Sequence, residues 1–183
     1  GTCGLGGHSR LIQNNLSKEG LLVSLDIDNE AIRECRNLLN ITHSRLHIEK
    51  SSYSNLPTIL KDLGINKVDG ILLDLGLSSM QLDSVDRGFS FTKDSYLDMR
   101  FDQDDQISAA DIINKSSEAE LANIIYNYGE ERRSRSIASK IIKNRPIINV
   151  QDLVNAIKKS TPPYKRNKTM ARVFQAFRIA VNK

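Results

Sequence analysis

The 183-residue sequence lacks the features that mark membrane-spanning, secreted and metal-binding proteins. No stretch approaches the roughly 18 consecutive apolar residues of a membrane-spanning helix. No basic-then-apolar leader opens the chain, so we expect a protein that is not secreted. Two cysteines, Cys3 and Cys35, are too few for a disulfide framework and lack metal-ligand spacing, so we expect no metal site. These absences predict a reducing compartment, the cytoplasm or an organelle matrix, and no membrane partner.

The second half of the chain is short of acidic residues. Residues 1–100 contain 11 lysines and arginines and 13 acids, whereas residues 132–183 contain 14 basic residues and one acid, Asp152. A surface this basic predicts a polyanionic partner such as nucleic acid. The alternative interpretation is a solvated helical surface whose charged head groups lie in water.

Residues 21–74 alternate between strand and helix patterns. Apolar runs that end at acids predict buried parallel strands, and helical spacing between them predicts helices that cover the sheet. Asp28 or Asn29 is the expected N-cap of the first of these helices. The fold class we expect is therefore α/β, built from βαβ units. The expected strands are Leu21–Leu25, 45–50 and Ile71–Leu73, and the expected helices are 28–39 and 56–64.

The pattern changes after residue 74. Residues 75–105 have the composition of a long irregular loop, which in a compact domain is usually functional. Beyond Gln106, apolar residues recur at i, i+3 and i+4, and the segments SSEAE and NVQD carry signals of helix N-termini. The expected helices are 108–115, 116–129, 130–145, 149–160 and 170–182.

The first ten residues, GTCGLGGHSR, form a glycine-rich loop. In open parallel sheets, ligands bind beyond the carboxyl ends of the strands, where this loop, Asp26, Tyr53 and Asp74 all fall. Glycines let backbone amides approach a ligand closely, and the N-terminus of the following helix favours anions. Asp26 lies 20 residues after Gly6, the distance at which an acid binds ribose hydroxyls. The pattern predicts a ligand with an adenosine-type ribose.

Two kinds of cofactor compete for this loop. A nucleotide-dependent dehydrogenase requires G-x-G-x-x-G, which the loop does not contain, and a P-loop lysine is also absent. S-adenosylmethionine has no phosphates, so the looser loop suits it better. Structural alternatives stay open for single residues: Asp74 could cap a turn, Tyr53 could be a half-buried loop residue, and Phe89 and Phe91 could belong to the core.

Six short motifs follow one another along the chain: GLGGHS, DLGLSSMQLD, RGFSF, LDMR, YGEE and FQAFRIAVN. As a set they resemble the ribosomal RNA small subunit methyltransferase H family, S-adenosylmethionine-dependent enzymes that methylate the N4 amine of cytidine. The resemblance covers essentially the whole chain. It implies a class I, Rossmann-like methyltransferase sheet with an inserted all-helical small domain. The implied partner is small-subunit ribosomal RNA or a ribosomal particle, and a homodimer is one assembly state left open.

The resemblance also implies domain boundaries and site residues. Residues 1–103 would form part of the cofactor-binding domain, 104–168 the helical insertion that binds RNA, and 169–183 a helix that returns to the first domain. Our own hypothesis for the catalytic residues is that Asp74 and Ser78 receive the N4 hydrogens. The implied cofactor contacts are Gly6, Gly7, His8, Asp26, Tyr53, Asp74 and Gln81.

The charge or the aromatic ring of other residues predicts further roles. We expect Phe89 or Phe91 to stack on the target base, unless they belong to the core, and Asp98 to pair with Arg100. Phosphate contacts are expected from the basic residues, which position a substrate without specifying it. On one amphipathic helix we expect Arg132, Arg133, Arg135, Lys140 and Lys143, and beside the last helix Lys165, Arg166, Lys168 and Arg172.

Two other functions stay open at this point. One is a methyltransferase that acts on another nucleic acid, and the other is a non-catalytic RNA-binding protein derived from a methyltransferase. Members of the family carry a strand before the first loop and continue past the last motif. We therefore expect the chain to be a fragment.

Overall fold

The structure, a computed structural model, describes residues 1–39 and 44–183. The chain divides into two compact units, Gly1–Ser78 and Ser79–Lys183. The first contains a parallel sheet with helices and the second is helical, so the predicted α/β class is confirmed. The functional boundaries at 103/104 and 168/169 stay predictions, because the compact units are defined by packing alone. Within the described residues, no helix is both long and apolar enough to cross a membrane.

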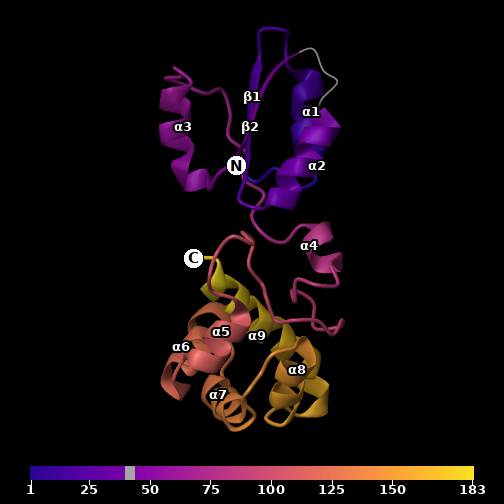
Figure 1. Ribbon diagram of the computed structural model, residues 1–183, viewed down its shortest axis with the longest axis vertical. Helices are drawn as coiled ribbons and strands as arrows, with labels where there is room; N and C mark the ends of the chain where they lie inside the picture. Colours follow the sequence, from indigo (N-terminus) through magenta and orange to yellow (C-terminus); the bar gives the residue numbers. More distant parts are fainter. Residues whose placement is uncertain (40–43) are drawn as a thin grey trace. The chain divides into compact units, whose positions relative to one another are not determined.

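The first unit packs helices against a two-stranded parallel sheet. Its elements are α1 (Gly7–Asn15), β1 (Leu21–Asp26), α2 (Asn29–Leu39), β2 (Arg45–Lys50), the 3-10 turn η1 (Tyr53–Asn55) and α3 (Leu56–Asp62). The register places Leu21 opposite Arg45 and Asp26 opposite Lys50. Figure 1 shows α1 and α2 on one side of the strands and α3 on the other. Both strands therefore end at the same edge of the sheet, as the sequence predicts.

The helix α2 covers the sheet with the apolar face that its sequence predicts. Asp28 precedes the helix, and its Oδ1 accepts a hydrogen bond of 3.0 Å from the Glu30 amide, as expected of an N-cap. The buried positions of α2 pack against one cluster of side chains from the strands and from the start of the chain. The cluster consists of Cys3, Ile32, Cys35 and Leu39, flanked by Leu22, Leu46 and Ile48.

The predicted third strand, Ile71–Leu73, is wrong: the segment has neither strand nor helix structure. The hydroxyl of Thr2 accepts from the amide of Asp74 and donates to its carbonyl, both at 3.0 Å. A side chain therefore makes the backbone hydrogen bonds that a neighbouring strand would make. The Gly1 nitrogen donates to the Leu72 carbonyl at 2.9 Å. The segment thus lies beside the start of the chain without a continuous backbone ladder. Ile71 is 62% exposed, which a buried strand would not allow.

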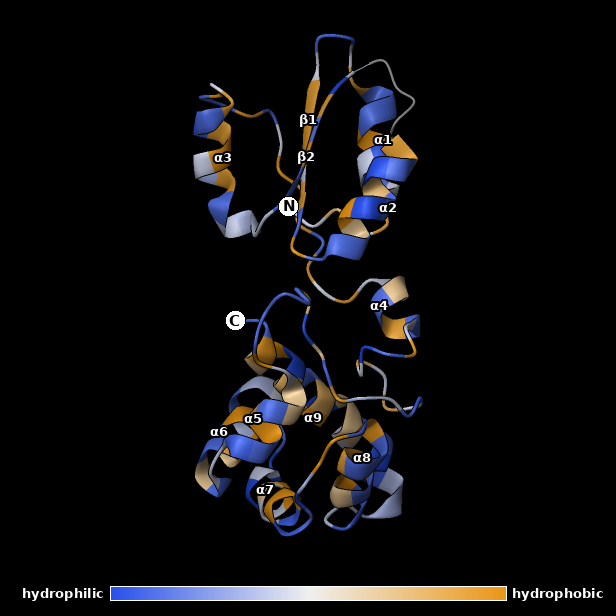
Figure 2. Cartoon of the chain, in the orientation of Figure 1, coloured by the Kyte–Doolittle hydropathy of each residue, from blue (hydrophilic) through white to orange (hydrophobic). Residues whose placement is uncertain are grey.

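The second unit is built from helices. Its elements are α4 (Ser79–Asp83), α5 (Ala109–Lys115), α6 (Glu118–Gly129), α7 (Ser134–Lys143), α8 (Val150–Lys158), the 3-10 turn η2 (Pro163–Lys165) and α9 (Arg166–Val181). Capping boxes mark the starts of α5, α6 and α8. Capping boxes join Ser117 to Glu120 and Asn149 to Asp152, which confirms the two predicted N-terminal signals. Figure 2 shows that these helices carry separate hydrophobic and hydrophilic bands. Their buried positions include Leu121, Ile125, Ile137, Ile141, Leu153 and Phe177.

The starts of two helices, α7 and α9, differ clearly from the prediction. The helix expected over 130–145 begins only at Ser134, because Glu130 adopts a left-handed conformation (φ 52°) that ends α6. Glu131 then accepts a hydrogen bond from the Arg133 amide at 3.0 Å and shapes the turn between the helices. The last helix begins earlier than expected, at Arg166, directly after η2.

Candidate functional site

The glycine-rich loop lies beside the end of β1 and turns the chain sharply into α1. Gly4 and Gly6 have φ values of 50° and 80°, in the left-handed region that glycine adopts without steric cost. Cys3 donates its amide to the Leu25 carbonyl at 2.8 Å, which ties the loop to the end of β1. Gly6 is the N-cap of α1 and has no side chain to bond the first amides of the helix. Those amides and the positive end of the helix dipole suit an anionic group.

Asp26, the last residue of β1, is bonded directly to this loop. Its Oδ2 accepts from the Gly4 amide at 2.9 Å, and its Oδ1 accepts from the Asp28 amide at 3.0 Å. A carboxylate offers about four lone-pair sites, so two amides leave acceptor capacity for ligand hydroxyls. The sequence distance between Gly6 and Asp26 therefore corresponds to a real contact between the loop and the acid.

Asp74 reaches the same loop from a distant part of the chain. Its backbone is held by the hydroxyl of Thr2 at 3.0 Å, and its Oδ2 lies 3.6 Å from Nδ1 of His8, the second residue of α1. The side chains of His8 and Asp74 are 61% and 68% exposed, so a ligand can reach both. The structure thus gathers Asp26, His8 and Asp74 around one glycine loop within the first unit.

The remaining predicted site residues are placed differently. Tyr53 begins η1 and is 45% exposed, and a Cβ built on Gly1 would lie 3.0 Å from the Tyr53 Cβ, so Tyr53 is close to the start of the chain. Ser78 is the last residue of the first unit. Gln81 belongs to α4 of the second unit and is buried there. The role of Gln81 as a cofactor contact stays a prediction.

Sequence reasoning missed the support that three residues give to the group formed by the loop, Asp26 and Asp74. Thr2 positions Asp74 across 72 residues of sequence, a link that no spacing pattern reveals. Cys3 and Cys35, far apart in sequence, are buried in the same cluster under the loop. A hydrogen bond between the two thiols, together with burial, raises the pKa of the Cys3 thiol. Cys3 is therefore a neutral packing group beside the site and not a nucleophile.

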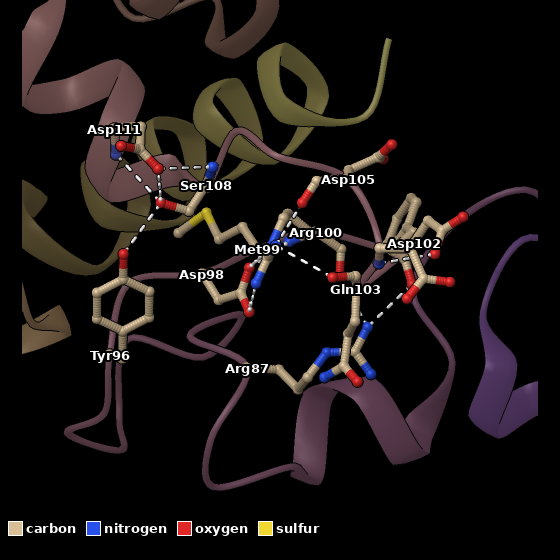
Figure 3. A network of polar contacts seen from close by, with 12 residues as sticks. Arg87, Tyr96, Asp98, Met99, Arg100, Asp102, Gln103, Asp105, Ser108 and Asp111 are labelled. Atoms are coloured by element: carbon tan, nitrogen blue, oxygen red, sulfur yellow. Dashed lines mark hydrogen bonds and ion pairs between the residues drawn. The ribbon is translucent and has the colours of Figure 1, made fainter.

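In the second unit, the predicted pair of Asp98 and Arg100 is confirmed. Nε and Nη2 of Arg100 donate to the two carboxylate oxygens of Asp98 at 2.5 and 3.1 Å, and Nη1 bonds the carbonyls of Gln103 and Asp105 (Figure 3). Arg87 donates to the Arg100 carbonyl at 2.7 Å. These bonds hold the irregular segment in one conformation around Arg100.

The phenylalanines of the RGFSF motif pack inside the second unit. Phe89 is buried and stacks on Phe101 with ring centroids 5.6 Å apart, and the Arg87 guanidinium lies over its ring. Phe91 meets the ring of Phe174 edge-on at 5.7 Å. The core interpretation therefore holds for Phe89, whose ring is not available to a base.

The predicted basic helix needs a correction. Arg132 and Arg133 precede α7, because α6 ends at the left-handed Glu130 and a turn follows. Arg135, Lys140 and Lys143 do lie on α7, and Arg166, Lys168 and Arg172 lie on α9. The basic residues therefore come from two helices and the turn between α6 and α7.

The family profile of the MraW methylases matches residues 1–183, the whole chain. The chain belongs to the MraW methylase family. This confirms the resemblance drawn from the six motifs, and the fold class is that of the class I methyltransferases. Methyltransferases of this family use S-adenosylmethionine.

Curated relatives of this MraW-family chain are named ribosomal RNA small subunit methyltransferase H. The protein of Fusobacterium nucleatum is 44% identical over 185 residues, which cover 100% of this chain and 59% of the relative. The Thermosipho africanus protein is 46% identical over 186 residues, covering 99% and 63%, and the Brevibacillus brevis protein is 45% identical over 187 residues, covering 99% and 60%. The chain thus spans about 60% of the length of such relatives.

Proposed function

We propose that the intact protein transfers a methyl group from S-adenosylmethionine to the N4 amine of a cytidine in small-subunit ribosomal RNA. The observation that carries the proposal is the direct bonding of the glycine loop to Asp26, with Asp74 beside the same loop. Membership of the MraW family supports the reaction class, and the names of the relatives support the RNA substrate.

The residues of the first unit fit the parts of S-adenosylmethionine. Asp26 would accept from the ribose hydroxyls, because its carboxylate keeps free lone pairs beside the Gly4 amide. The amides of Gly7 and His8 at the start of α1 would receive the anionic carboxylate of the cofactor, with Gly6 allowing close approach. Tyr53, half exposed, offers a ring for the adenine, and Gln81 is proposed as a further contact. When bound, the cofactor supplies an electrophilic methyl group.

The chain must also make a weak nucleophile react. The cytosine amine has its lone pair delocalised into the ring, so it must be aligned with the methyl group and must lose a proton as the new bond forms. We assign proton acceptance to the exposed carboxylate of Asp74 and the holding of the second N4 hydrogen to Ser78. The amine is engaged in any base pair, so the target base must be unpaired or flipped out.

We further propose that the second unit holds the RNA and that the protein works in the cytoplasm. Residues 79–183 contain 18 basic and 13 acidic residues, and the basic surplus lies after Arg132. Phosphate contacts from such a surface position RNA without reading its sequence. A homodimer stays a prediction.

The first test combines calorimetry with methyl transfer by the intact protein. We expect S-adenosylmethionine binding, and transfer to small-subunit ribosomal RNA that exceeds transfer to DNA. RNA binding without any affinity for the cofactor would support the non-catalytic alternative, and preferential transfer to DNA would support another nucleic-acid substrate.

The second test replaces the proposed proton acceptor. Asp74→Ala should lower kcat about 100-fold or more, the usual contribution of a general base. Asp69→Asn, at an exposed aspartate of the same unit, is the matched control and should leave kcat unchanged. Unchanged turnover in a folded Asp74→Ala variant would remove Asp74 from the mechanism.

A further inference from the structure

A polar groove lies within the helical unit, at the end of α6. Its volume is about 600 Å³, within the range of small-ligand sites. The C-terminal end of α6, the turn that follows it and the side of α9 supply its walls. The lining residues are Tyr126, Asn127, Glu130, Arg132 and Arg172.

The groove owes its shape to a close crossing of two helices. A Cβ on Gly129 would lie 2.4 Å from the Arg172 carbonyl oxygen, so only glycine lets the end of α6 approach α9 this closely. The next residue, Glu130, adopts the left-handed conformation and turns the chain away from the helix axis. The reversal places Arg132 on the same groove as Arg172.

A buried carboxylate holds one of the two arginines in place. Glu131 is 5% exposed, and its Oε2 lies 3.8 Å from Nη1 of Arg172 and accepts from the Thr169 hydroxyl at 3.1 Å. Its Oε1 accepts from the Arg133 amide at 3.0 Å. Arg172 is therefore restrained at the groove wall before any ligand arrives, which lowers the entropy that binding must overcome.

The lining has the chemistry of a nucleotide site. The Tyr126 side chain is 58% exposed and offers a flat ring on which a base can stack. Arg132 and Arg172 can bond phosphate oxygens, and the Asn127 amide and the exposed Glu130 carboxylate can meet the donors and acceptors of a base edge. An acidic peptide would use the two arginines but would leave the ring of Tyr126 without a stacking partner.

We propose that this groove binds one nucleotide of an unpaired RNA segment, with the base on Tyr126 and the flanking phosphate between Arg132 and Arg172. The inference rests on the proposed function, because it names a subsite for the same RNA. An unpaired segment is required, since bases inside an A-form helix expose no face for stacking.

The test measures the affinity of the intact protein for a short fluorescent single-stranded RNA of mixed sequence. Tyr126→Leu should weaken binding about fivefold or more, whereas Tyr126→Phe, which keeps the ring, should bind like the unchanged protein. Arg132→Gln should weaken binding and lower the slope of log K against log salt by about 0.7, one phosphate contact to a single strand. Arg33→Gln, at an exposed arginine of α2 in the first unit to which no RNA contact is assigned, is the matched control.

Each outcome bears on the groove. The inference is overturned if Tyr126→Leu binds RNA like the unchanged protein, or if Arg33→Gln weakens binding as much as Arg132→Gln. It is also overturned if a polyglutamate peptide displaces the RNA and Tyr126→Leu does not change that displacement, the result expected of an acidic-peptide site. Cofactor calorimetry on the same samples separates the two proposals. Loss of RNA affinity in the groove variants of a protein that binds no S-adenosylmethionine would keep the groove and reject the methyltransferase.

Discussion

Asp26 is the residue on which the proposed cofactor binding depends most directly. Its carboxylate holds the Gly4 amide at 2.9 Å and is the proposed acceptor for the ribose hydroxyls. Hydrogen bonds to a charged group contribute about 1.5–3 kcal/mol each, so Asp26→Ala should raise the Kd for S-adenosylmethionine about tenfold or more. Calorimetry with the intact protein measures the change.

The amide variant separates two roles of the same side chain. Asp26→Asn keeps an acceptor for the Gly4 amide but loses the charge that strengthens bonds to ribose hydroxyls. We expect its Kd to fall between those of Asp26→Ala and the unchanged protein. If Asp26→Asn binds the cofactor fully, the residue only positions the loop, and the ribose assignment is wrong.

At the scale of the element, the capping box of α5 predicts a pH-dependent stability. The Lys115 ammonium, then the Ser108 hydroxyl and amide, lower the pKa of Asp111 from 3.8 to about 2 (Figure 3 shows the Ser108 bonds). A lowered pKa means that the carboxylate stabilises the fold at pH values above about 4, and that this contribution is lost as the pH falls towards 2.

Replacement of Asp111 tests this reasoning. Asp111→Ala should lower the free energy of unfolding by about 1 kcal/mol at neutral pH, a typical value for a lost cap. The difference should shrink as the pH falls from about 4 to 2, because the unchanged protein then loses the same charge. Urea unfolding at several pH values measures it, and a constant difference across that window would mean that the charge contributes nothing.

The crossing of α6 and α9 gives a second prediction at this scale. Gly129→Ala would bring a Cβ to 2.4 Å from the Arg172 carbonyl oxygen, a backbone atom that cannot move aside alone. Overpacking of this kind costs about 1–3 kcal/mol, so the free energy of unfolding should fall by that amount. Asn123→Ala, at an exposed position of α6, should change it by less than about 0.5 kcal/mol. Equal stabilities of the two variants in urea unfolding would contradict the close crossing.

The elements also show where sequence reasoning succeeds. The helix starts at Ser117 and Asn149 were predictable, because a capping box is a local pattern that needs no knowledge of the rest of the chain. The start of α7 was missed, because Glu130 adopts a conformation that a residue other than glycine rarely takes. The prediction of the third strand was wrong. The segment is instead hydrogen-bonded to Gly1 and Thr2, at the distant start of the chain, and no local pattern reveals these contacts.

The site residues, like the helix starts, were predictable only where the contacts that place them are close in the sequence. Asp26 was predictable from its distance to Gly6, since a glycine loop, a helix and the next strand in this order fix where an acid at the end of that strand falls. The groove of the second unit was not, because Arg172 joins residues 126–132 only through the packing of α9 on α6. Its motif, YGEE, nevertheless contains the glycine and the acid that build it.

At the scale of the whole molecule, the two units differ in charge. Residues 1–78 contain eight basic and nine acidic residues, whereas residues 79–183 contain 18 and 13. RNA held by the second unit, as proposed above, would release counterions when it binds, so its affinity should fall steeply with salt. The cofactor, held in the proposed site by a few amides and carboxylates of the first unit, would release almost none.

The two ligands of one protein should therefore respond to salt differently. Between 50 and 200 mM salt, we expect RNA affinity to fall about tenfold or more, since even a few phosphate contacts give a slope of several units for log K against log salt. Affinity for S-adenosylmethionine should stay within about twofold over the same range. Fluorescence titration of RNA and calorimetry of the cofactor, in the same buffers, measure both. Equal and small salt effects on the two affinities would show that the basic residues after Arg132 are solvated surface, and the RNA would then have to bind through contacts other than charge.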